Sequence, residues 1–242
     1  MEWHDQGIIL SARKYGEYDA ILDVLTKDHG RHCGILKGGY GRNKRGEIQP
    51  GNEVVVKWRG RLETHLGTYT VELKNARSVS FLYNPAKLAA MNSCCSLLSV
   101  ALAENEAHEK LYAGLLAFFD LLAEADDDIK SWAPLLVRWE IGLLAELGFG
   151  LHLDECAASG SKEGLYYVSP KSGRAVNREA GEPYKNRLLI LPAFLADSKK
   201  EPTDSDIENG LKLTAFFMKR DMLAPHGKNL PQARRMLEDH IL

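Results

Sequence analysis

The residues best suited to do chemistry lie between Arg31 and Arg61, where positive charge is concentrated. This stretch carries eight Lys and Arg residues but only two carboxylates, Glu47 and Glu53. Its net charge is therefore +6, in a chain whose total charge is −2. Lys and Arg neutralise phosphate groups when a protein binds nucleic acid. The concentration of cations predicts a phosphate-binding surface in this part of the chain.

Glycines and aromatic residues are interleaved with these cations. Glycine lets a ligand approach the backbone closely, and aromatic rings stack on unpaired bases. Trp58 is a less certain stacking residue, because its segment alternates like a strand with one face in a core. The predicted DNA-binding residues are Lys37, Tyr40, Arg42, Lys44, Arg45, Lys57, Arg59 and Arg61. A solvated hairpin tip is the simpler alternative, and the next candidates are then Arg13, Lys14, Arg234 and Arg235.

The charge is unevenly distributed along a chain of globular composition. Residues 1–78 have a net charge of +3, and residues 79–242 have −5. The chain has 242 residues, of which 45% are hydrophobic and 26% charged, and no apolar run approaches the about 20 residues of a membrane span. The start MEWHDQG lacks the features of a signal peptide. We expect a cytoplasmic protein with a phosphate-binding first part and a second part that meets proteins.

Short β-strand patterns occupy the basic first part. Apolar or alternating segments of six to seven residues, separated by turn residues, lie at 7–13, 20–26, 31–37, 53–59 and 68–73. Five short strands in about 75 residues suit a small Greek-key barrel of the oligonucleotide-binding (OB) kind. We therefore expect an OB-fold domain over residues 1–79. The Gly-rich connection from Gly38 to Pro50 would flank its binding face.

Helical patterns dominate residues 80–242, which we expect to form a second domain. Asn84 and Pro85 have the character of a helix start. The predicted helices cover 86–103, 106–124, 131–148 with Ser131 as the N-cap, 204–222, and a short segment after Pro231. The fold class is therefore α+β, with a five-stranded barrel followed by an α-helical domain. Arg234 and Arg235 are expected to be exposed on the last helix.

Arg138 stands among apolar residues of the third predicted helix. Arg holds a carboxylate with two parallel hydrogen bonds. We predict a groove that binds a partner's acidic, carboxylate-ended peptide and is lined by Phe118, Phe119, Arg138, Leu143, Leu144 and Leu147. The alternative is that Arg138 pairs with a carboxylate of its own chain.

The segment 151–192 has the layout of a small zinc ribbon, but it lacks the ligands. A structural zinc needs four thiolate or imidazole ligands, typically from two Cys-x-x-Cys pairs. The corresponding pairs here are Cys156 with Ser159, and Asn177 with Ala180. We therefore expect a metal-free insert. The other cysteines, at positions 33, 94 and 95, suggest no disulfide framework, and the adjacent pair fits a helix core.

No catalytic arrangement is evident in the sequence. The Gly-rich segment at Gly38–Gly41 lacks the Lys-Ser/Thr ending of a nucleotide-binding P-loop. The three aspartates at 126–128 have no further ligands nearby and fit a solvated loop. We expect a protein that is not an enzyme and uses no cofactor.

The order and spacing of several motifs resemble the RecO family, bacterial recombination mediators of the RecF pathway. The motifs are QGIILSARKYGEYDAILDVLTKDHGR, GILKGGYGR, IQPGNEV, VRWEIGLLAELGFGL, LDECAASG and VSPKSGRAV, and together they extend over the whole chain. The resemblance implies an OB domain, a helical domain and a zinc-ribbon-like insert. Many members keep four cysteines in that insert, whereas this chain matches only at Cys156.

The resemblance also carries functional expectations. It implies binding of single- and double-stranded DNA, annealing of complementary strands, and association with the nucleoid in recombinational DNA repair. It further implies binding of RecR and of the C-terminal tail of the single-stranded-DNA-binding protein, which together help to load recombinase. The alternative from another class is an RNA-binding OB-fold accessory protein, and competition between DNA and RNA of one sequence would separate the two. A third, an OB-containing hydrolase, would need a metal or nucleophile set that the sequence does not offer.

Overall fold

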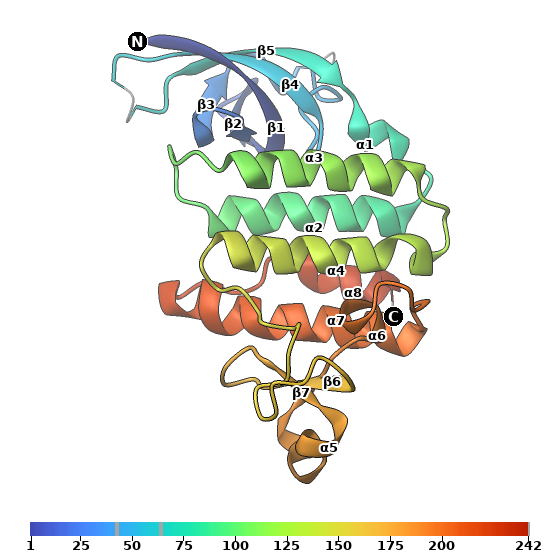
Figure 1. Ribbon diagram of the computed structural model, residues 1–242. Coiled ribbons are helices and arrows are strands. Elements are labelled where there is room, and N and C mark those ends of the chain that lie inside the picture. The colour runs from blue at the N-terminus through green and yellow to red at the C-terminus, as the bar shows by residue number, and fades with distance from the viewer. Residues whose placement is uncertain (42–43, 63–64, 242) are drawn as a thin grey trace. The chain divides into compact units, whose positions relative to one another are not determined.

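The computed structural model describes residues 1–41, 44–62 and 65–241 (Figure 1). The chain divides into two compact units. The first contains Met1–Phe119 and Pro231–His240, and the second contains Asp120–Leu230. Strands come first and helices follow, which confirms the predicted α+β class.

Five strands close into a barrel at the start of the first unit. They are β1 (Glu2–Tyr15), β2 (Asp19–Thr26), β3 (Gly30–Leu36), β4 (Glu53–Arg59) and β5 (Thr68–Asn75). Their order around the barrel is β1-β2-β3-β5-β4. Neighbouring strands are antiparallel except β3 and β5, which run parallel. This five-stranded closed barrel is the predicted OB fold.

Strand β1 pairs along both of its edges. Residues 2–8 pair with β4, and residues 7–15 pair with β2. The register shifts between Ile9 and Ser11, and an irregularity of this kind bends a strand and increases its twist. β1 therefore joins the two sides of the barrel and closes it. The sequence pattern predicted this strand only from residue 7, because the preceding polar residues do not alternate with apolar ones.

Trp58 lies in the barrel core. Its side chain is fully buried, and its indole Nε1 donates a hydrogen bond to the carbonyl oxygen of Leu66 at 3.1 Å. The rings of Trp3 and Trp58 stack with their centroids 5.7 Å apart. The core position considered for Trp58 from the alternating pattern is therefore the observed one.

The helices of the first unit are α1 (Arg77–Ser80), α2 (Pro85–Ala101), most of α3 (Glu109–Glu124) and α8 (Gln232–Ile241). Asn84 caps α2 as predicted, because its side-chain oxygen accepts the backbone N–H of Lys87 at 3.0 Å. Helix α2 packs against β1, and both Cys94 and Cys95 are buried in the core. Gly51 has a φ of +84°, and a Cβ there would lie 2.2 Å from the sulfur of Met91. The chain approaches α2 too closely at Gly51 for any side chain.

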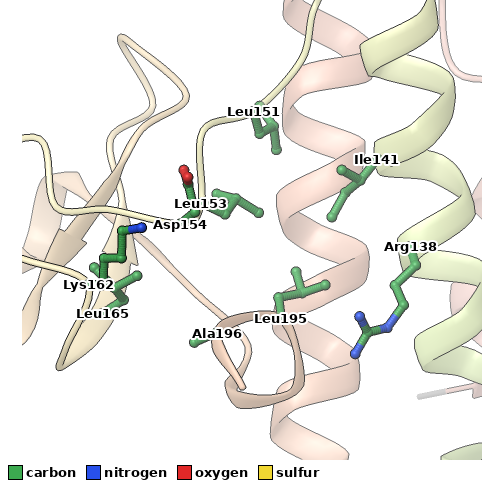
Figure 2. A pocket seen from close by; sticks show the side chains of 9 residues that line it. All are labelled: Arg138, Ile141, Leu151, Leu153, Asp154, Lys162, Leu165, Leu195 and Ala196. Carbon is green, nitrogen blue, oxygen red and sulfur yellow. The ribbon is translucent and has the colours of Figure 1, made fainter. Parts of the chain in front are cut away.

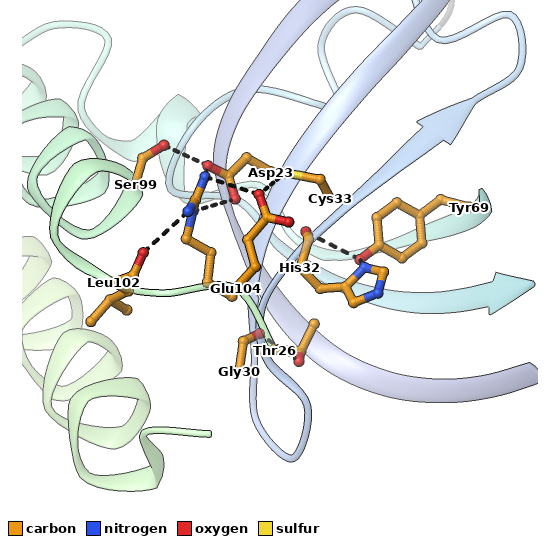
Figure 3. Close-up of polar contacts among 10 residues, drawn as sticks. Asp23, Thr26, Gly30, His32, Cys33, Tyr69, Ser99, Leu102 and Glu104 are labelled. Carbon is orange, nitrogen blue, oxygen red and sulfur yellow. Dashed lines mark hydrogen bonds and ion pairs between the residues drawn. The ribbon is translucent and has the colours of Figure 1, made fainter. Parts of the chain in front are cut away.

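A buried polar junction ties the barrel to α2 (Figure 3). Both carboxylate oxygens of Asp23 on β2 accept hydrogen bonds from Arg31 Nε on β3, each at 3.0 Å. The Ser99 hydroxyl on α2 donates to the same carboxylate. Arg31 also donates to the carbonyl oxygen of Leu102 at 3.1 Å, just after α2 ends. A buried ion pair requires such additional hydrogen bonds to offset the loss of hydration.

The second unit combines helices with a small sheet. Helix α4 (Ile129–Glu146) packs against α7 (Asp204–Phe217), and the Thr214 hydroxyl donates to the buried carboxylate of Glu140. Strands β6 (Leu165–Val168), β7 (Ala175–Asn177) and β8 (Leu189–Ile190) form a sheet in the order β7-β6-β8. The remaining elements are α5 (Arg178–Gly181), η1 (Glu182–Arg187), α6 (Ala193–Ala196), η2 (Met218–Leu223) and η3 (Ala224–His226).

Two predictions about helix ends are wrong. The N-cap of α4 is Asp128 rather than Ser131, because the Asp128 carboxylate accepts the backbone N–H of Lys130. The aspartate run lies in the loop just before α4, as predicted, and its last member, Asp128, caps the helix. Arg234 was expected to be exposed but is fully buried, and its guanidinium pairs with Glu238 at 3.0 Å. The i, i+4 spacing on α8 allows this pairing.

Replacing Asp23 by Ala is expected to destabilise the first unit. Among the described residues, the change leaves the partly buried Arg31 guanidinium only the more exposed carboxylate of Glu104, 3.6 Å away, and loss of one partner of a buried ion pair costs up to about 3 kcal/mol. Chemical denaturation followed by circular dichroism measures the loss. Glu2→Ala, which breaks the exposed pair between Glu2 and Lys57, is the control and should leave stability unchanged. Equal stability of the two variants would contradict the role given to the junction.

Candidate nucleic-acid interface

One group of the predicted DNA-binding residues gathers beside the turn between β1 and β2. The backbone N–H of Tyr40 donates to the carbonyl oxygen of Tyr18 in this turn at 2.9 Å. The Lys37 ammonium pairs with Asp19 at 2.7 Å. We call this group the turn-side patch, and its described members are Lys37, Tyr40, Lys44 and Arg45. Arg42 lies outside the described residues.

The Tyr40 ring is held within the turn-side patch rather than left free. Its hydroxyl donates to the carbonyl oxygen of Ala12 at 3.2 Å, and the residue packs against the barrel core. The Arg45 guanidinium lies over the ring, 5.4 Å from its centroid. A small cavity of about 140 Å³ lies at this position, with walls that include Ile48 and Pro50. A base can therefore reach the Tyr40 ring only if Arg45 moves.

The other predicted residues lie near the beginning of β1. Lys57 is paired across the ladder with His4, and Arg59 with Glu2. Both cations are exposed, and so is Arg61. The hydrogen bond and charge of Lys57, 2.6 Å away, hold the pKa of Glu2 below its usual value. We call Lys57, Arg59 and Arg61 the strand-start patch.

The two patches lie near opposite ends of β1. The strand-start patch is next to Glu2, whereas the turn-side patch contacts Ala12. Ten residues of strand correspond to about 33 Å along the chain, at about 3.3 Å per residue. The structure therefore divides the predicted surface into two patches.

Sequence reasoning missed two exposed tyrosines beside the turn-side patch. Tyr15 ends β1 and Tyr18 lies in the turn before β2, and their relative exposures are 48% and 61%. The signal was present in the sequence, because both rings lie in a five-residue turn segment directly after Arg13 and Lys14. They were counted only as turn residues.

Arg138 lines a pocket of about 550 Å³ in the second unit (Figure 2). Its guanidinium is exposed, donates to the carbonyl oxygen of Phe194 and lies 5.7 Å from the centroid of the Phe194 ring. Within the described residues, no carboxylate forms an ion pair with it. Other residues of the pocket are Ile141, Leu151, Leu153, Asp154, Lys162, Leu165, Leu195 and Ala196. The pocket therefore has apolar walls together with two cations, Arg138 and Lys162, and one carboxylate, that of Asp154.

The apolar residues predicted to accompany Arg138 do not line this pocket. Phe118, Phe119, Leu143 and Leu144 are buried, and Leu147 is half-buried. They come from two helices, α3 and the end of α4, whose apolar character was correctly recognised, but four of the five side chains are buried in the core. Most of the pocket walls come from the segments after α4, namely a loop with Leu153, strand β6 with Leu165 and the four-residue helix α6 with Leu195, none of which is long enough to give a helical periodic signal.

The insert brings its two zinc-knuckle positions together without metal ligands. The backbone N–H of Asn177 donates to the Cys156 sulfur at 3.3 Å, and the Asn177 side-chain amide donates to the Ser159 hydroxyl at 3.2 Å. Asn177 Oδ1 also accepts the N–H of Ala180 at 2.9 Å. The four positions are thus linked by hydrogen bonds. One thiol, one hydroxyl, one amide and one methyl group do not form a zinc site.

The surroundings of Cys156 favour its thiolate. Burial alone would raise the pKa of this thiol, but the Ser159 hydroxyl and the backbone N–H groups of Asn177, Ser159 and Ala158 lower the pKa to about 7. Donation from backbone N–H groups stabilises a charged acceptor.

Across the part of the chain that the structure describes, His, Cys, Asp and Glu nowhere form a group of three that could hold a metal ion. Within the same part, none of the helices combines the length and the apolar character needed to cross a membrane.

The chain begins with a closed five-stranded barrel that carries cationic patches, and helices with a small β insert follow in the sequence. These features define an OB-fold protein with a helical extension. Comparison with known families gives a match in both halves. The model "Recombination protein O N terminal" matches residues 1–77, and "Recombination protein O C terminal" matches residues 82–229. The chain belongs to the RecO family.

Several curated relatives resemble the chain over nearly its whole length. The DNA repair protein RecO of Methylocella silvestris is 46% identical over 97% of this chain and 94% of the relative. Those of Rhodospirillum rubrum and Hyphomonas neptunium are 44% and 43% identical, each over 100% of this chain and over 96% and 98% of the relative. The chain therefore spans nearly the full length of these relatives.

Protein purified without a chelator is expected to contain no stoichiometric zinc. Only Cys156 among the four knuckle positions supplies a thiolate, and the others bond to one another. Elemental analysis of the purified chain is the measurement. The variant Ser159→Cys/Asn177→Cys/Ala180→Cys is the positive control, because it places thiols at all four positions and should take up one zinc. One zinc per wild-type chain would show that other ligands hold a metal.

Proposed function

We propose that this protein is a non-enzymatic DNA-binding protein of recombinational DNA repair in the RecF pathway. It binds single- and double-stranded DNA, anneals complementary strands, and acts with RecR and the single-stranded-DNA-binding protein to help load recombinase. Family membership over both halves of the chain is the observation that carries this proposal. The named relatives are DNA repair proteins. The protein is proposed to work in the cytoplasm, on nucleoid DNA.

The cations of the barrel support the DNA-binding role. In this proposal, Lys37, Lys44 and Arg45 contact phosphates at one end of β1, and Lys57, Arg59 and Arg61 do so at the other. Arg42, which lies outside the described residues, is proposed to contact phosphate as well. Tyr40 adds a contact to a base. Two separated patches give one chain two places at which it can neutralise a DNA backbone, which suits a protein that brings two strands together. Binding of this kind releases counterions and depends strongly on salt.

The pocket at Arg138 supports a role in partner binding. We propose that it takes the acidic, carboxylate-ended tail of the single-stranded-DNA-binding protein. The exposed Arg138 guanidinium would hold the terminal carboxylate, while Ile141, Leu153 and Leu195 would contact apolar side chains. Arg presents two parallel N–H groups to a carboxylate. Only Asp154 adds a negative charge to the residues that line the pocket.

Removing cations from the turn-side patch is expected to change the salt dependence of DNA binding. The logarithm of the affinity for single-stranded DNA should fall linearly with the logarithm of salt concentration, by about 0.7 per neutralised phosphate. Arg42→Ala/Lys44→Ala/Arg45→Ala should weaken binding and make the slope shallower by up to about 2, because three contacts are lost. Fluorescence anisotropy across a salt series measures both quantities.

The charge-matched control for that variant is Lys171→Ala/Lys199→Ala/Lys200→Ala. It removes three exposed lysines of the second unit and should leave the slope as in wild type. A wild-type slope and affinity in the Arg42, Lys44 and Arg45 variant would show that this loop is only a solvated tip. Competition with RNA of the same sequence tests the alternative: RNA that displaces DNA at lower concentration would favour an RNA-binding accessory protein.

Arg138→Ala is expected to weaken binding of the tail peptide by about tenfold or more, because a hydrogen bond to a charged group contributes about 1.5–3 kcal/mol. DNA affinity should not change. Isothermal titration calorimetry with the free-acid peptide and with its C-terminally amidated form isolates the carboxylate contact. Arg187→Ala removes another exposed Arg of the second unit and is the matched control. An unchanged peptide affinity, with reduced stability, would assign Arg138 a structural role through Phe194.

A further inference from the structure

The turn between β1 and β2 exposes two aromatic rings within four residues. Tyr15 is 48% exposed and Tyr18 is 61% exposed. Both rings belong to the short connection between β1 and β2, which is closed by the ladder pair of Tyr15 with Asp19. Aromatic rings contribute large apolar surfaces, which proteins usually bury or use for contacts. Two such rings in one turn form a ready contact surface.

Cations adjoin these rings in the sequence and in the turn. Arg13 and Lys14 directly precede Tyr15, both are exposed, and within the described residues neither forms an ion pair. Lys37 lies beside the turn through its pair with Asp19. The nearby carboxylates are Glu17 and Asp19, of which Asp19 is neutralised by Lys37.

The polar end of Tyr18 already has a partner. Its hydroxyl forms a hydrogen bond with the Glu17 side chain, which raises the pKa of the phenol. The hydroxyl is therefore occupied locally, while most of the ring remains accessible. Tyr40, by contrast, is covered on one side by Arg45 and bonded to Ala12. Of the aromatic residues in this region, Tyr15 and Tyr18 are the ones that a ligand reaches without rearrangement.

Exposed rings next to unpaired cations match the chemistry of an unpaired nucleotide. A cation neutralises the phosphate, and an aromatic face stacks on the base without regard to its identity. Bases within a duplex are already stacked on each other, so a contact of this kind favours single strands. An acidic peptide would use the cations but offers no base to stack on the rings.

We propose that Tyr15 and Tyr18 form a stacking platform for unpaired bases of single-stranded DNA, with Arg13 and Lys14 on the adjacent phosphates. The inference rests on the proposed DNA binding and assigns part of it to residues outside the predicted set. It places the single-strand contact at the β1–β2 turn, next to the turn-side patch. The strand-start patch, which has no comparable exposed tyrosine pair within the described residues, then serves the phosphate backbone alone.

The test compares two ligands of equal length and charge. One is oligo-dT, and the other is the same deoxyribose-phosphate chain without bases. Tyr15→Leu/Tyr18→Leu should lose about tenfold or more in affinity for oligo-dT, which corresponds to about 1.4 kcal/mol. Its affinity for the abasic chain, and its salt slope on either ligand, should remain those of wild type. Tyr15→Phe/Tyr18→Phe should bind oligo-dT like wild type, because the rings are retained.

Tyr83→Leu is the matched control. Tyr83 is 99% exposed in the same compact unit, and its loss should not affect either ligand. Thermal unfolding of every variant checks that the barrel is intact, and the two single Tyr→Leu variants serve if the double variant is unstable. Unchanged affinity of the Leu variants for oligo-dT would overturn the platform. Equal loss on the abasic chain would also overturn it.

Other results would overturn the inference in ways that remain distinguishable from the DNA-binding proposal itself. If wild type binds neither ligand, the proposed function and the platform both fail. If wild type binds DNA and the Leu variants lose only the binding of RecR, the turn is a protein-docking surface and only the platform fails. If wild type prefers oligo-U to oligo-dT and the Leu variants lose only that preference, the rings serve RNA.

Discussion

Closure of the barrel by β1 is the constraint on which the rest of the first unit depends. A single strand must supply hydrogen bonds to β4 through its first half and to β2 through its second half. The register shift between Ile9 and Ser11 lets β1 bend between the half that pairs with β4 and the half that pairs with β2. A strand that closes a barrel in this way also separates whatever its two ends carry. The turn-side patch meets β1 at Ala12, and the strand-start patch meets it where Lys57 and Arg59 pair with its first residues, so the length of β1 separates the two groups of cations.

Helix α2 packs against the closed barrel. Asp23 and Arg31 lie on neighbouring strands and meet Ser99 and the end of α2 (Figure 3). A buried ion pair does little for stability by itself, but it tolerates few partners and few geometries. The pair of Asp23 and Arg31, through its hydrogen bonds to Ser99 and Leu102, therefore helps to fix the position at which α2 meets the sheet. Gly51 adds a steric condition, since the chain passes directly beside Met91.

Much of the fold could be predicted from the sequence because its signals are local. Period-two patterns marked the strands, and Asn84 with Pro85 marked the start of α2. The N-cap of α4 was missed because three consecutive aspartates and Ser131 are all good caps, and the sequence alone does not choose among them. The burial of Arg234 was also missed, since an Arg beside another Arg on a polar helix gives no sign of a buried position.

The candidate sites were harder to predict because they depend on which distant residues meet. The cations themselves were recognised, but their division between two ends of β1 follows from strand register. Tyr15 and Tyr18 looked like ordinary turn residues until their exposure was known. The groove at Arg138 was expected to combine Phe118 and Phe119 of α3 with apolar residues from the end of α4, the helix that carries Arg138. The residues that do line the pocket, such as Leu153 and Leu195, come from a loop and from the four-residue helix α6, which are too irregular or too short to show a helical repeat.

The hydrogen-bonded knuckles of the insert change what the cell must provide for this protein. A four-thiolate zinc site needs a supply of metal, and it releases that metal when its sulfurs are oxidised. Here hydrogen bonds from Asn177 to Cys156 and to Ser159 link the two knuckles, and the one sulfur among the four knuckle positions, that of Cys156, is buried. The shape of this insert is therefore encoded in its own backbone and side chains. For a protein proposed to act on damaged DNA, that arrangement separates the integrity of the insert from the zinc and redox balance of the cell in which the damage occurs.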